Sequence, residues 1–197
     1  MERIAGIILA AGGARRYGSP KLLLDWQGQP FVRQVASTAL SAGLSPVVLV
    51  SGAEAEAVQA AVAGLALLVV HNAEWEKGQS GSLQTGLRAL PDEVGAAVFL
   101  LADQPQIPVE LILALLKKYS ETGLPVIMPR SRERRGNPVL FARPAFNDLL
   151  TLEGDVGGRA ILERYEIGEV IWEDPLFLLD VDTPEDYQRL LSKKMSG

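Results

Sequence analysis

Short apolar segments alternate with segments that have the apolar spacing of helices. The apolar segments in the first 101 residues are continuous and rich in Val, Ile and Leu, which is typical of strands covered by helices on both faces. This alternation predicts a mainly parallel sheet with right-handed crossovers, and ligands that bind beyond the carboxyl ends of its strands. The expected strands are 4–9, 47–51, 65–71 and 96–101, and the expected helices are 31–42, 54–62, 82–90 and 109–121.

The second half of the chain is less regular, and no internal repeat or low-complexity linker interrupts it. A chain of 197 residues with 48% hydrophobic and 22% charged residues suits one α/β domain over residues 1–197. Hairpin-like segments in this half are expected to form a lid over a second substrate. The expected elements are strands 126–128 and 138–141, helices 144–150 and 159–165, an extended stretch 169–182 and a last helix from Pro184.

Composition excludes several classes of function. The net charge of −5 argues against a general nucleic-acid or anionic-membrane surface, which needs a clustered excess of Lys and Arg. Without cysteine the chain has no disulfide, no thiolate nucleophile and no sulfur-ligated metal. There is no targeting segment and no run of eighteen apolar residues, so we expect a cytoplasmic protein with no membrane partner.

A loop of small residues, 9–21 (L-A-A-G-G-A-R-R-Y-G-S-P-K), ends the first expected strand. Its backbone N–H groups, Arg16 and Lys21 could hold an anion such as a nucleoside triphosphate. A P-loop does not fit, because Lys21 lies nine positions after Gly12. The dinucleotide fingerprint does not fit either, since the loop leads into 22–25, which is expected to be extended.

The loop resembles the signature L-A-A-G-x-x-x-R-x-G-x-x-K of nucleotidyltransferases that share the nucleotide-diphospho-sugar transferase fold. Within that group the chain most resembles the molybdenum cofactor cytidylyltransferases, which are MobA-like NTP transferases. The resemblance implies a single-domain, three-layer α/β/α, Rossmann-like fold with a mainly parallel sheet. Four more segments match in family order: 72–83 (N-A-E-W-E-K-G-Q-S-G-S-L), 102–105 (A-D-Q-P), 135–141 (R-G-N-P-V-L-F) and 180–186 (D-V-D-T-P-E-D).

The activity implied by this resemblance is magnesium-dependent transfer of CMP from CTP to the phosphate of molybdopterin cofactor, with release of pyrophosphate. CTP is favoured because guanylyl-transferring relatives tend to carry L-A-G-G where this chain has L-A-A-G at 9–12. The expected partners are CTP and a phosphorylated pterin cofactor, with a molybdoenzyme or its chaperone as a further candidate and no nucleic acid. Two alternatives stay open: a guanylyl- or other nucleotidyltransferase with a different phosphorylated acceptor, and a non-catalytic protein that delivers the cofactor.

Transfer of this kind requires orientation and charge neutralisation rather than a protein nucleophile. Arg16 and Lys21 are therefore the candidate catalytic residues. Asp103 follows an apolar run and would emerge at the carboxyl end of a strand, where a Mg²⁺ ion needs only one or two protein carboxylates. The resemblance gives Asp182 as the second metal ligand, with Asp180 as the alternative. The candidate nucleotide-binding residues are Leu9, Ala10, Ala11, Gly12, Gly13, Lys21, Gly78, Ser82 and Asp103.

Some of these residues also have an ordinary structural interpretation. Ser82 is expected to open and cap a helix, and the resemblance also places its segment around the base. Trp75 is expected to pack within the protein rather than to stack on a ligand. His71, the only histidine, is expected to have a structural role. Asp186 is expected on the last helix as an exposed or capping residue.

The basic run 130–135 is the only cluster of positive charge, and it precedes a segment that resembles the acceptor region of the family. A phosphate-bearing pterin would need cations there. The family usually has histidine at the position of Asn137. The residues expected to bind the acceptor are Arg134, Arg135, Asn137, Asp155 and Arg159.

Overall fold

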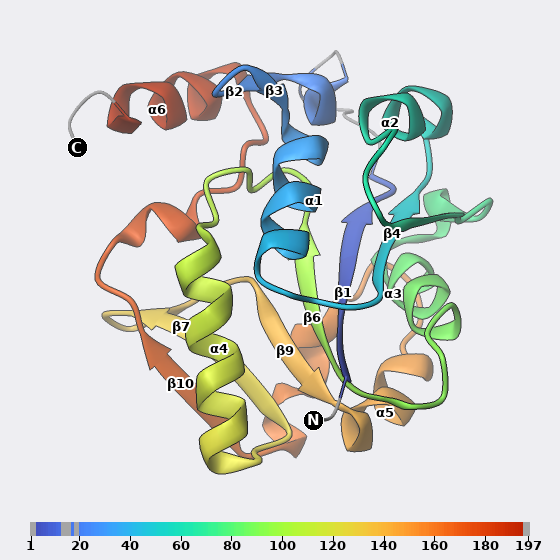
Figure 1. Cartoon of the computed structure of the whole chain (residues 1–197), viewed down its shortest axis with the longest axis vertical. Coiled ribbons are helices and arrows are strands. Elements are labelled where there is room, and N and C mark those ends of the chain that lie inside the picture. Colours follow the sequence, from blue (N-terminus) through green and yellow to red (C-terminus); the bar gives the residue numbers. More distant parts are fainter. Residues whose placement is uncertain (1–2, 13–16, 18–19, 195–197) are drawn as a thin grey trace.

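The computed structural model describes residues 3–12, 17 and 20–194 and contains one large sheet (Figure 1). The strands run in the order β10-β7-β9-β6-β1-β4-β5, and the short β8 pairs with β7. Their bounds are β1 Arg3–Ala10, β4 Val47–Ser51, β5 Leu68–His71, β6 Val94–Leu101, β7 Val126–Ser131, β8 Arg134–Arg135, β9 Val139–Ala142 and β10 Ile167–Ile171.

The sheet is mainly parallel, as the alternation of segments predicts. β1 lies between β4 and β6 and is parallel to both, and β5 and β10 are parallel to their neighbours. The exception is β9, which runs antiparallel to both β6 and β7. Because Leu9 of β1 pairs with Val50 on one side and Leu101 on the other, three strands end together at one edge of the sheet.

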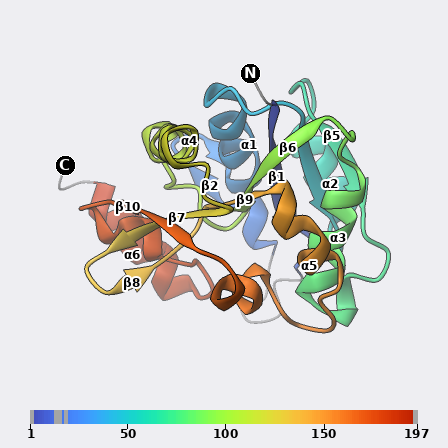
Figure 2. The same ribbon diagram turned by 90° about the horizontal axis from the view of Figure 1, so that it is seen from below.

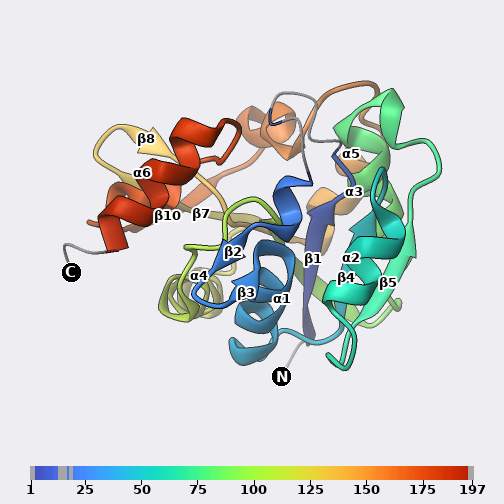
Figure 3. The same ribbon diagram turned by 90° about the horizontal axis from the view of Figure 1, so that it is seen from above.

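Helices cover both faces and make three layers. Figure 2 shows α1 and α4 on one side of the sheet and α3 and α5 on the other, and Figure 3 shows α6 beside the small hairpin of β2 (Asp25–Trp26) and β3 (Gln29–Pro30). No helix in the described ranges is long and apolar enough to span a membrane. The helices are α1 Phe31–Ser41, α2 Ala55–Ala61, α3 Gln79–Arg88, α4 Val109–Thr122, α5 Phe146–Leu150 and α6 Pro184–Lys194.

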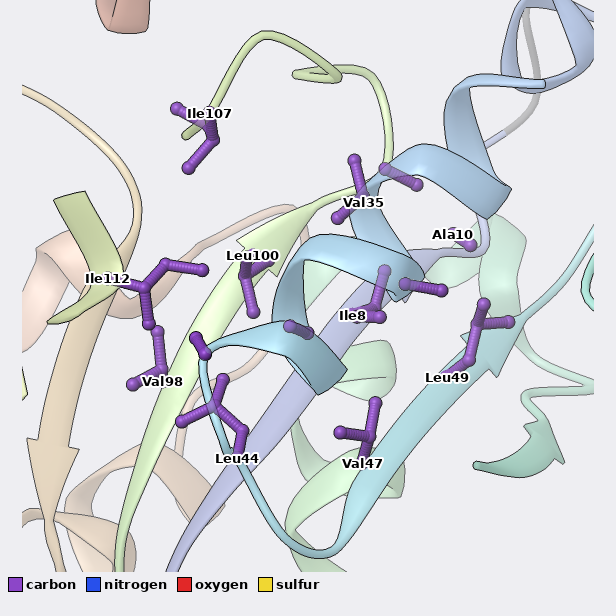
Figure 4. Packing of buried hydrophobic residues seen from close by; sticks show 14 of the residues in the cluster. Ile8, Ala10, Val35, Leu44, Val47, Leu49, Val98, Leu100, Ile107 and Ile112 are labelled. Carbon is purple, nitrogen blue, oxygen red and sulfur yellow. The ribbon is translucent and has the colours of Figure 1, made fainter. Parts of the chain in front are cut away.

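The core has two halves because successive strand residues point to opposite faces. Ile8 packs under α1 with Val35 and Leu49, as Figure 4 shows, whereas Ile7 faces the other layer. Burial of each such side chain stabilises the fold by about 1.5–3 kcal/mol. On the α3 side, a Cβ at Gly86 would lie 2.6 Å from Ile7 Cγ2, so glycine lets this helix approach β1 closely.

The start of α3 differs from the expectation. The helix begins at Gln79, not at Ser82, and its N-cap residue, Gly78, has no side chain that could cap it. Gly78 has a φ of 120°, and a Cβ there would lie 2.4 Å from the backbone of Gly154. The loop at 154–155 instead satisfies the first helical N–H groups: Gly154 O accepts from Ser80 N at 3.3 Å, and Asp155 Oδ1 accepts from Gln79 N at 3.3 Å. This contact from a distant loop is invisible in the local sequence.

Three other expectations were wrong in detail. The segment expected as extended at 22–25 begins with a 3-10 helix, Lys21–Leu23, before β2. The helix expected at 159–165 is a 3-10 helix, Gly158–Arg164. The extended stretch expected at 169–182 is interrupted by a 3-10 helix, Pro175–Leu178, because Asp174 caps Leu176 N at 2.9 Å.

Candidate active site

A lysine bridges two carboxylates from distant segments beyond the carboxyl edge of the sheet. Lys21 Nζ donates to Asp103 Oδ2 at 2.7 Å and to Asp182 Oδ1 at 2.8 Å. Asp103 lies two residues after β6, and Asp182 lies two residues before α6. Burial by itself would lower the pKa of Lys21, but Asp103 and Asp182 outweigh burial and raise this pKa, so the ammonium stays charged.

The start of α6 holds Asp182 in place. Asp186 Oδ2 accepts hydrogen bonds from Thr183 Oγ1 at 2.8 Å and from Thr183 N at 3.1 Å, while Thr183 Oγ1 accepts from Asp186 N at 3.2 Å. This reciprocal arrangement is a capping box. The bonds from Thr183 lower the pKa of Asp186, which keeps its carboxylate ionised. Asp186 therefore has the capping role expected of it, and it fixes the turn that carries Asp182.

The carboxylate of Asp180, the alternative metal ligand, contacts Gln104. Its Oδ1 accepts a hydrogen bond of 2.6 Å from Nε2 of the buried Gln104. Burial, followed by the charge of Asp103, raises the pKa of Asp180. The structure thus places Asp182, rather than Asp180, against Lys21.

A cavity of about 440 Å³ lies beside this cluster and collects the expected nucleotide-binding residues. Gly13 and Arg16 lie outside the described residues, as does Ala14. Trp75 also lines this cavity and packs against the second half of the core, whereas His71 is exposed at the end of β5, 3.4 Å from Ser51 Oγ. The residues of the cavity wall that were expected there are Leu9, Ala10, Ala11, Gly12, Lys21, Gly78, Ser82 and Asp103.

Asp155 also lines this first cavity, although it was expected at the acceptor. Its carboxylate accepts from Gln79 N, so Asp155 caps α3 from a loop 76 positions away in the sequence. Sequence spacing carries no signal for a cap of this kind.

A second cavity, of about 260 Å³, shares Leu9, Gln79 and Leu101 with the first. Polar and apolar groups line it in nearly equal share, and Phe99 and Phe141 make an edge-to-face pair there with centroids 5.7 Å apart. The apolar side chains that line it are Leu9, Leu83, Phe99, Leu101, Val139, Phe141 and Leu162.

A third, small cavity of about 190 Å³ shares Asn137, Arg159 and Asp180 with the second. Its lining adds Arg134 and Arg135, so it brings together four of the five residues expected to bind the acceptor. Gln104 lies in its wall too, with an Oε1 atom that has no partner among the described residues. Sequence reasoning had not assigned this glutamine a role, although it follows Asp103 directly in A-D-Q-P.

The basic run is partly neutralised. Glu169 on β10 pairs with Arg135 Nε at 2.7 Å and with Arg130 Nε at 2.8 Å. Arg134 forms no ion pair within the described part of the chain. Of the two arginines on β8, Arg134 is therefore the one whose charge is available to a ligand.

The donor set near Lys21 fits a magnesium ion that is shared with a ligand. Asp103 and Asp182 contact one ammonium group, so their oxygens are close enough to share a cation. The described residues contain no group of three or more His, Cys, Asp and Glu side chains that could hold a metal by themselves. Mg²⁺ commonly binds in this way, through one or two carboxylates with phosphate oxygens and water as the other ligands.

A mainly parallel sheet with a cation-bridged carboxylate pair and a cavity at its carboxyl edge is the arrangement expected for a nucleotidyltransferase. The chain belongs to the family described as the MobA-like NTP transferase domain, whose model matches residues 6–170. This finding confirms the family expected from the sequence.

Several known proteins are similar to the chain over nearly its whole length. Nicotine blue oxidoreductase of Paenarthrobacter nicotinovorans is 32% identical, over 95% of this chain and 96% of the relative. Purine catabolism protein PucB of Bacillus subtilis (strain 168) is also 32% identical, over 93% and 94%. Molybdenum cofactor cytidylyltransferase of Escherichia coli (strain K12) is 25% identical, over 95% of both. A crystal structure of Rv0371C from Mycobacterium tuberculosis H37Rv in complex with manganese superposes with a TM-score of 0.81 and 28% identity, over 96% and 98%.

Proposed function

We propose that this nucleotidyltransferase moves CMP from CTP to the phosphate of molybdopterin cofactor and releases pyrophosphate. The observation that carries the proposal is the Lys21 bridge between Asp103 and Asp182 at the wall of the 440 Å³ cavity. A relative that is 25% identical over 95% of its length bears the name of this activity. The two relatives at 32% identity bear other names, so the acceptor and the base must be tested directly.

In this reaction an oxygen of the acceptor phosphate attacks the α-phosphorus of CTP. The new P–O bond forms as the bond from the α-phosphorus to the bridging oxygen breaks, and pyrophosphate leaves with the electron pair. Lys21 would donate to phosphate oxygens on which negative charge grows, and stabilisation of this kind is commonly the largest contribution to catalysis. Asp103 and Asp182 would hold a divalent ion, which supplies further charge neutralisation when bound. The manganese complex of the mycobacterial relative supports divalent metal binding by proteins of this kind.

The neighbouring cavities suit an acceptor of this kind. The second cavity, beside the nucleotide site, combines a pair of phenylalanines with polar side chains such as Asn137 and Arg159, which suits a flat ring system with polar edges. The arginine-lined cavity that adjoins it could hold an anionic group. Because the first two cavities share Leu9, Gln79 and Leu101, two substrates could meet between them.

The test is pyrophosphate release by the purified protein with Mg²⁺ and each of CTP, GTP, ATP and UTP, with and without molybdopterin cofactor. We expect release only with CTP and the cofactor together. Thermal unfolding checks binding separately: a nucleotide at a hundred times its dissociation constant adds about 2.7 kcal/mol, which raises Tm by roughly 5 to 10 °C in a chain of this size.

The other outcomes point to the alternatives. Pyrophosphate release with GTP and the cofactor, but with none of the other three nucleotides, would favour a guanylyltransferase. CTP binding with no transfer to this cofactor would favour a different phosphorylated acceptor. Cofactor binding without any response to nucleotides would favour a delivery protein.

A further inference from the structure

Asn72 is a buried polar residue next to the nucleotide cavity, and the mechanism above does not use it. It directly follows β5, its side chain is 6% exposed, and its backbone N–H donates to Ser51 O at 2.9 Å. Its amide contacts Ser82, which is 5% exposed and lines the cavity. Asn72 itself does not line that cavity.

The direction of each hydrogen bond around Asn72 is fixed. The backbone N–H of Glu74 can only donate, and it lies 3.0 Å from Asn72 Oδ1, so this end of the amide is the oxygen. The other end is therefore the NH₂ group, which donates to Ser82 Oγ at 3.0 Å. Ser82 accepts this bond and keeps its own hydroxyl hydrogen.

The other hydroxyl groups on α3 use their hydrogens within the protein. Ser80 Oγ donates to Gly154 O at 2.7 Å, and Thr85 Oγ1 donates to Gly81 O at 2.8 Å. For Ser82 the described residues provide no such acceptor. Its hydrogen is thus available to a ligand in the cavity.

We propose that Asn72 is a positioning residue that keeps the Ser82 hydroxyl as a hydrogen-bond donor to the nucleotide base and thereby contributes to the choice of base. The inference rests on the proposed function, because it needs a nucleotide in this cavity. A neutral donor suits an acceptor atom of a neutral base, such as the O2 or N3 of cytosine, while Lys21 suits the phosphates. The fixed polarity would disfavour a base that presents an N–H group at this point.

The test measures equilibrium binding of CTP and of inorganic tripolyphosphate, both with Mg²⁺, by calorimetry. In Asn72→Asp the new carboxylate can only accept, so Ser82 turns its hydrogen toward it and presents a lone pair to the base. We expect CTP affinity to fall about tenfold or more, as in Ser82→Ala, because each change removes the donor. Tripolyphosphate has no base, and its affinity should be unchanged in both variants. Asn72→Ala frees the hydroxyl to rotate and also removes the acceptor of the Glu74 N–H, but it leaves Ser82 able to donate, so it should show a smaller loss.

The double variant Asn72→Asp, Ser82→Ala distinguishes an effect of Asn72 that acts through Ser82 from a general structural effect of the substitution. If Asn72 acts through Ser82, the double variant binds CTP no more weakly than Ser82→Ala alone. Thr85→Val is the matched control, since it removes a hydroxyl from the same helix outside the cavity, and it should keep CTP affinity within about twofold.

Several results would overturn the inference. These are normal CTP binding in Asn72→Asp, additive losses in the double variant, or an equal loss for tripolyphosphate. Failure of the wild-type protein to bind any nucleoside triphosphate would refute the proposed function as well. Normal binding of CTP by all the variants would refute only the role of Asn72.

Discussion

In the proposed reaction Lys21 has two roles that involve the same atom. Its Nζ bridges Asp103 and Asp182, and it is the described cation best placed to meet a triphosphate. Only 14% of the Lys21 side chain is exposed, and 19% of Asp103, so water screens the first of these pairs weakly. Loss of this lysine should therefore affect both stability and turnover.

Lys21→Met tests this dual role because methionine keeps the unbranched chain, one atom shorter, and removes its charge. Without Mg²⁺ we expect a loss of roughly 1 to 3 kcal/mol in the free energy of unfolding, since two carboxylates are left facing each other. Mg²⁺ should reduce this loss by taking the place of the ammonium. Turnover should fall on the order of a hundredfold, as when one preorganised donor is removed.

Thermal unfolding with and without Mg²⁺, together with steady-state kinetics, provides the measurement. Lys117→Met is the matched control, because Lys117 on α4 is exposed and pairs only with Glu121 at 3.8 Å. Near-normal turnover in Lys21→Met would show that this residue takes no part in catalysis.

At the scale of elements, the β7–β8 hairpin decides which arginines can meet an acceptor. Glu169 on the neighbouring β10 forms ion pairs with Arg130 and Arg135. Arg134 lines the 190 Å³ cavity and has no ion pair among the described residues. Arg134 therefore differs from Arg130 and Arg135, although the run looks uniform in the sequence.

We expect Arg134→Ala to raise the KM of the acceptor about tenfold and to leave the KM of CTP unchanged, because a free cation at a phosphate contributes on the order of 1.5 kcal/mol. Arg135→Ala should have a smaller effect, since Glu169 already neutralises that guanidinium. Steady-state kinetics with each substrate varied in turn measures both constants.

Arg132→Asn serves as the control for this hairpin. Arg132 lies in its turn with a φ of 54°, a conformation that asparagine tolerates, and it does not line the cavity. A selective loss of CTP affinity in Arg134→Ala would instead place this arginine at the pyrophosphate end of the site.

At the scale of the whole molecule, the sheet brings together carboxylates that are far apart in the sequence. Asp103 follows the central strand β6, and Asp182 precedes the last helix. Their contact with one lysine makes a shared Mg²⁺ feasible. Asp180 lies outside this contact, bonded to Gln104.

Asp103→Asn and Asp182→Asn should each abolish magnesium-dependent turnover, whereas Asp180→Asn should be milder. Each variant keeps the size of the side chain and removes one negative charge, so the comparison isolates the metal site. Turnover titrated with Mg²⁺ measures the effect. Activity that survives Asp182→Asn but is lost in Asp180→Asn would show that Asp180, not Asp182, is the second metal ligand.

Asp180→Asn should also stabilise the protein at pH 7. The folded-state pKa of Asp180 is raised above its ordinary value of 3.8 by burial, so its ionised form disfavours folding at neutral pH. This cost disappears as the pH falls through the raised pKa. The gain in unfolding free energy should accordingly be largest at pH 7 and shrink toward pH 4, as denaturant unfolding across that range would measure. A gain that did not change with pH would contradict this explanation.

The layered fold could be predicted from the sequence, as could a loop that follows the first strand at the carboxyl edge of the sheet. Short continuous apolar runs that alternate with helical patterns are typical of strands buried on both faces, so the runs ending at Leu9 and Leu101 were expected inside a sheet with ligands at its carboxyl edge. Local patterns also indicated the capping role of Asp186, because the residues of a capping box are three positions apart.

The three-dimensional arrangement alone shows which distant side chains meet. Asp182, rather than Asp180, contacts Lys21, and Arg135 pairs with Glu169. The helix α3 begins at Gln79, whose N–H group donates to the cap from Asp155. The tertiary structure also set the direction of the hydrogen bond from Asn72 to Ser82. The physical reason is that periodicity fixes the local conformation and the buried face of a segment. Contacts between side chains far apart in sequence depend instead on strand order and loop geometry, which no local pattern encodes.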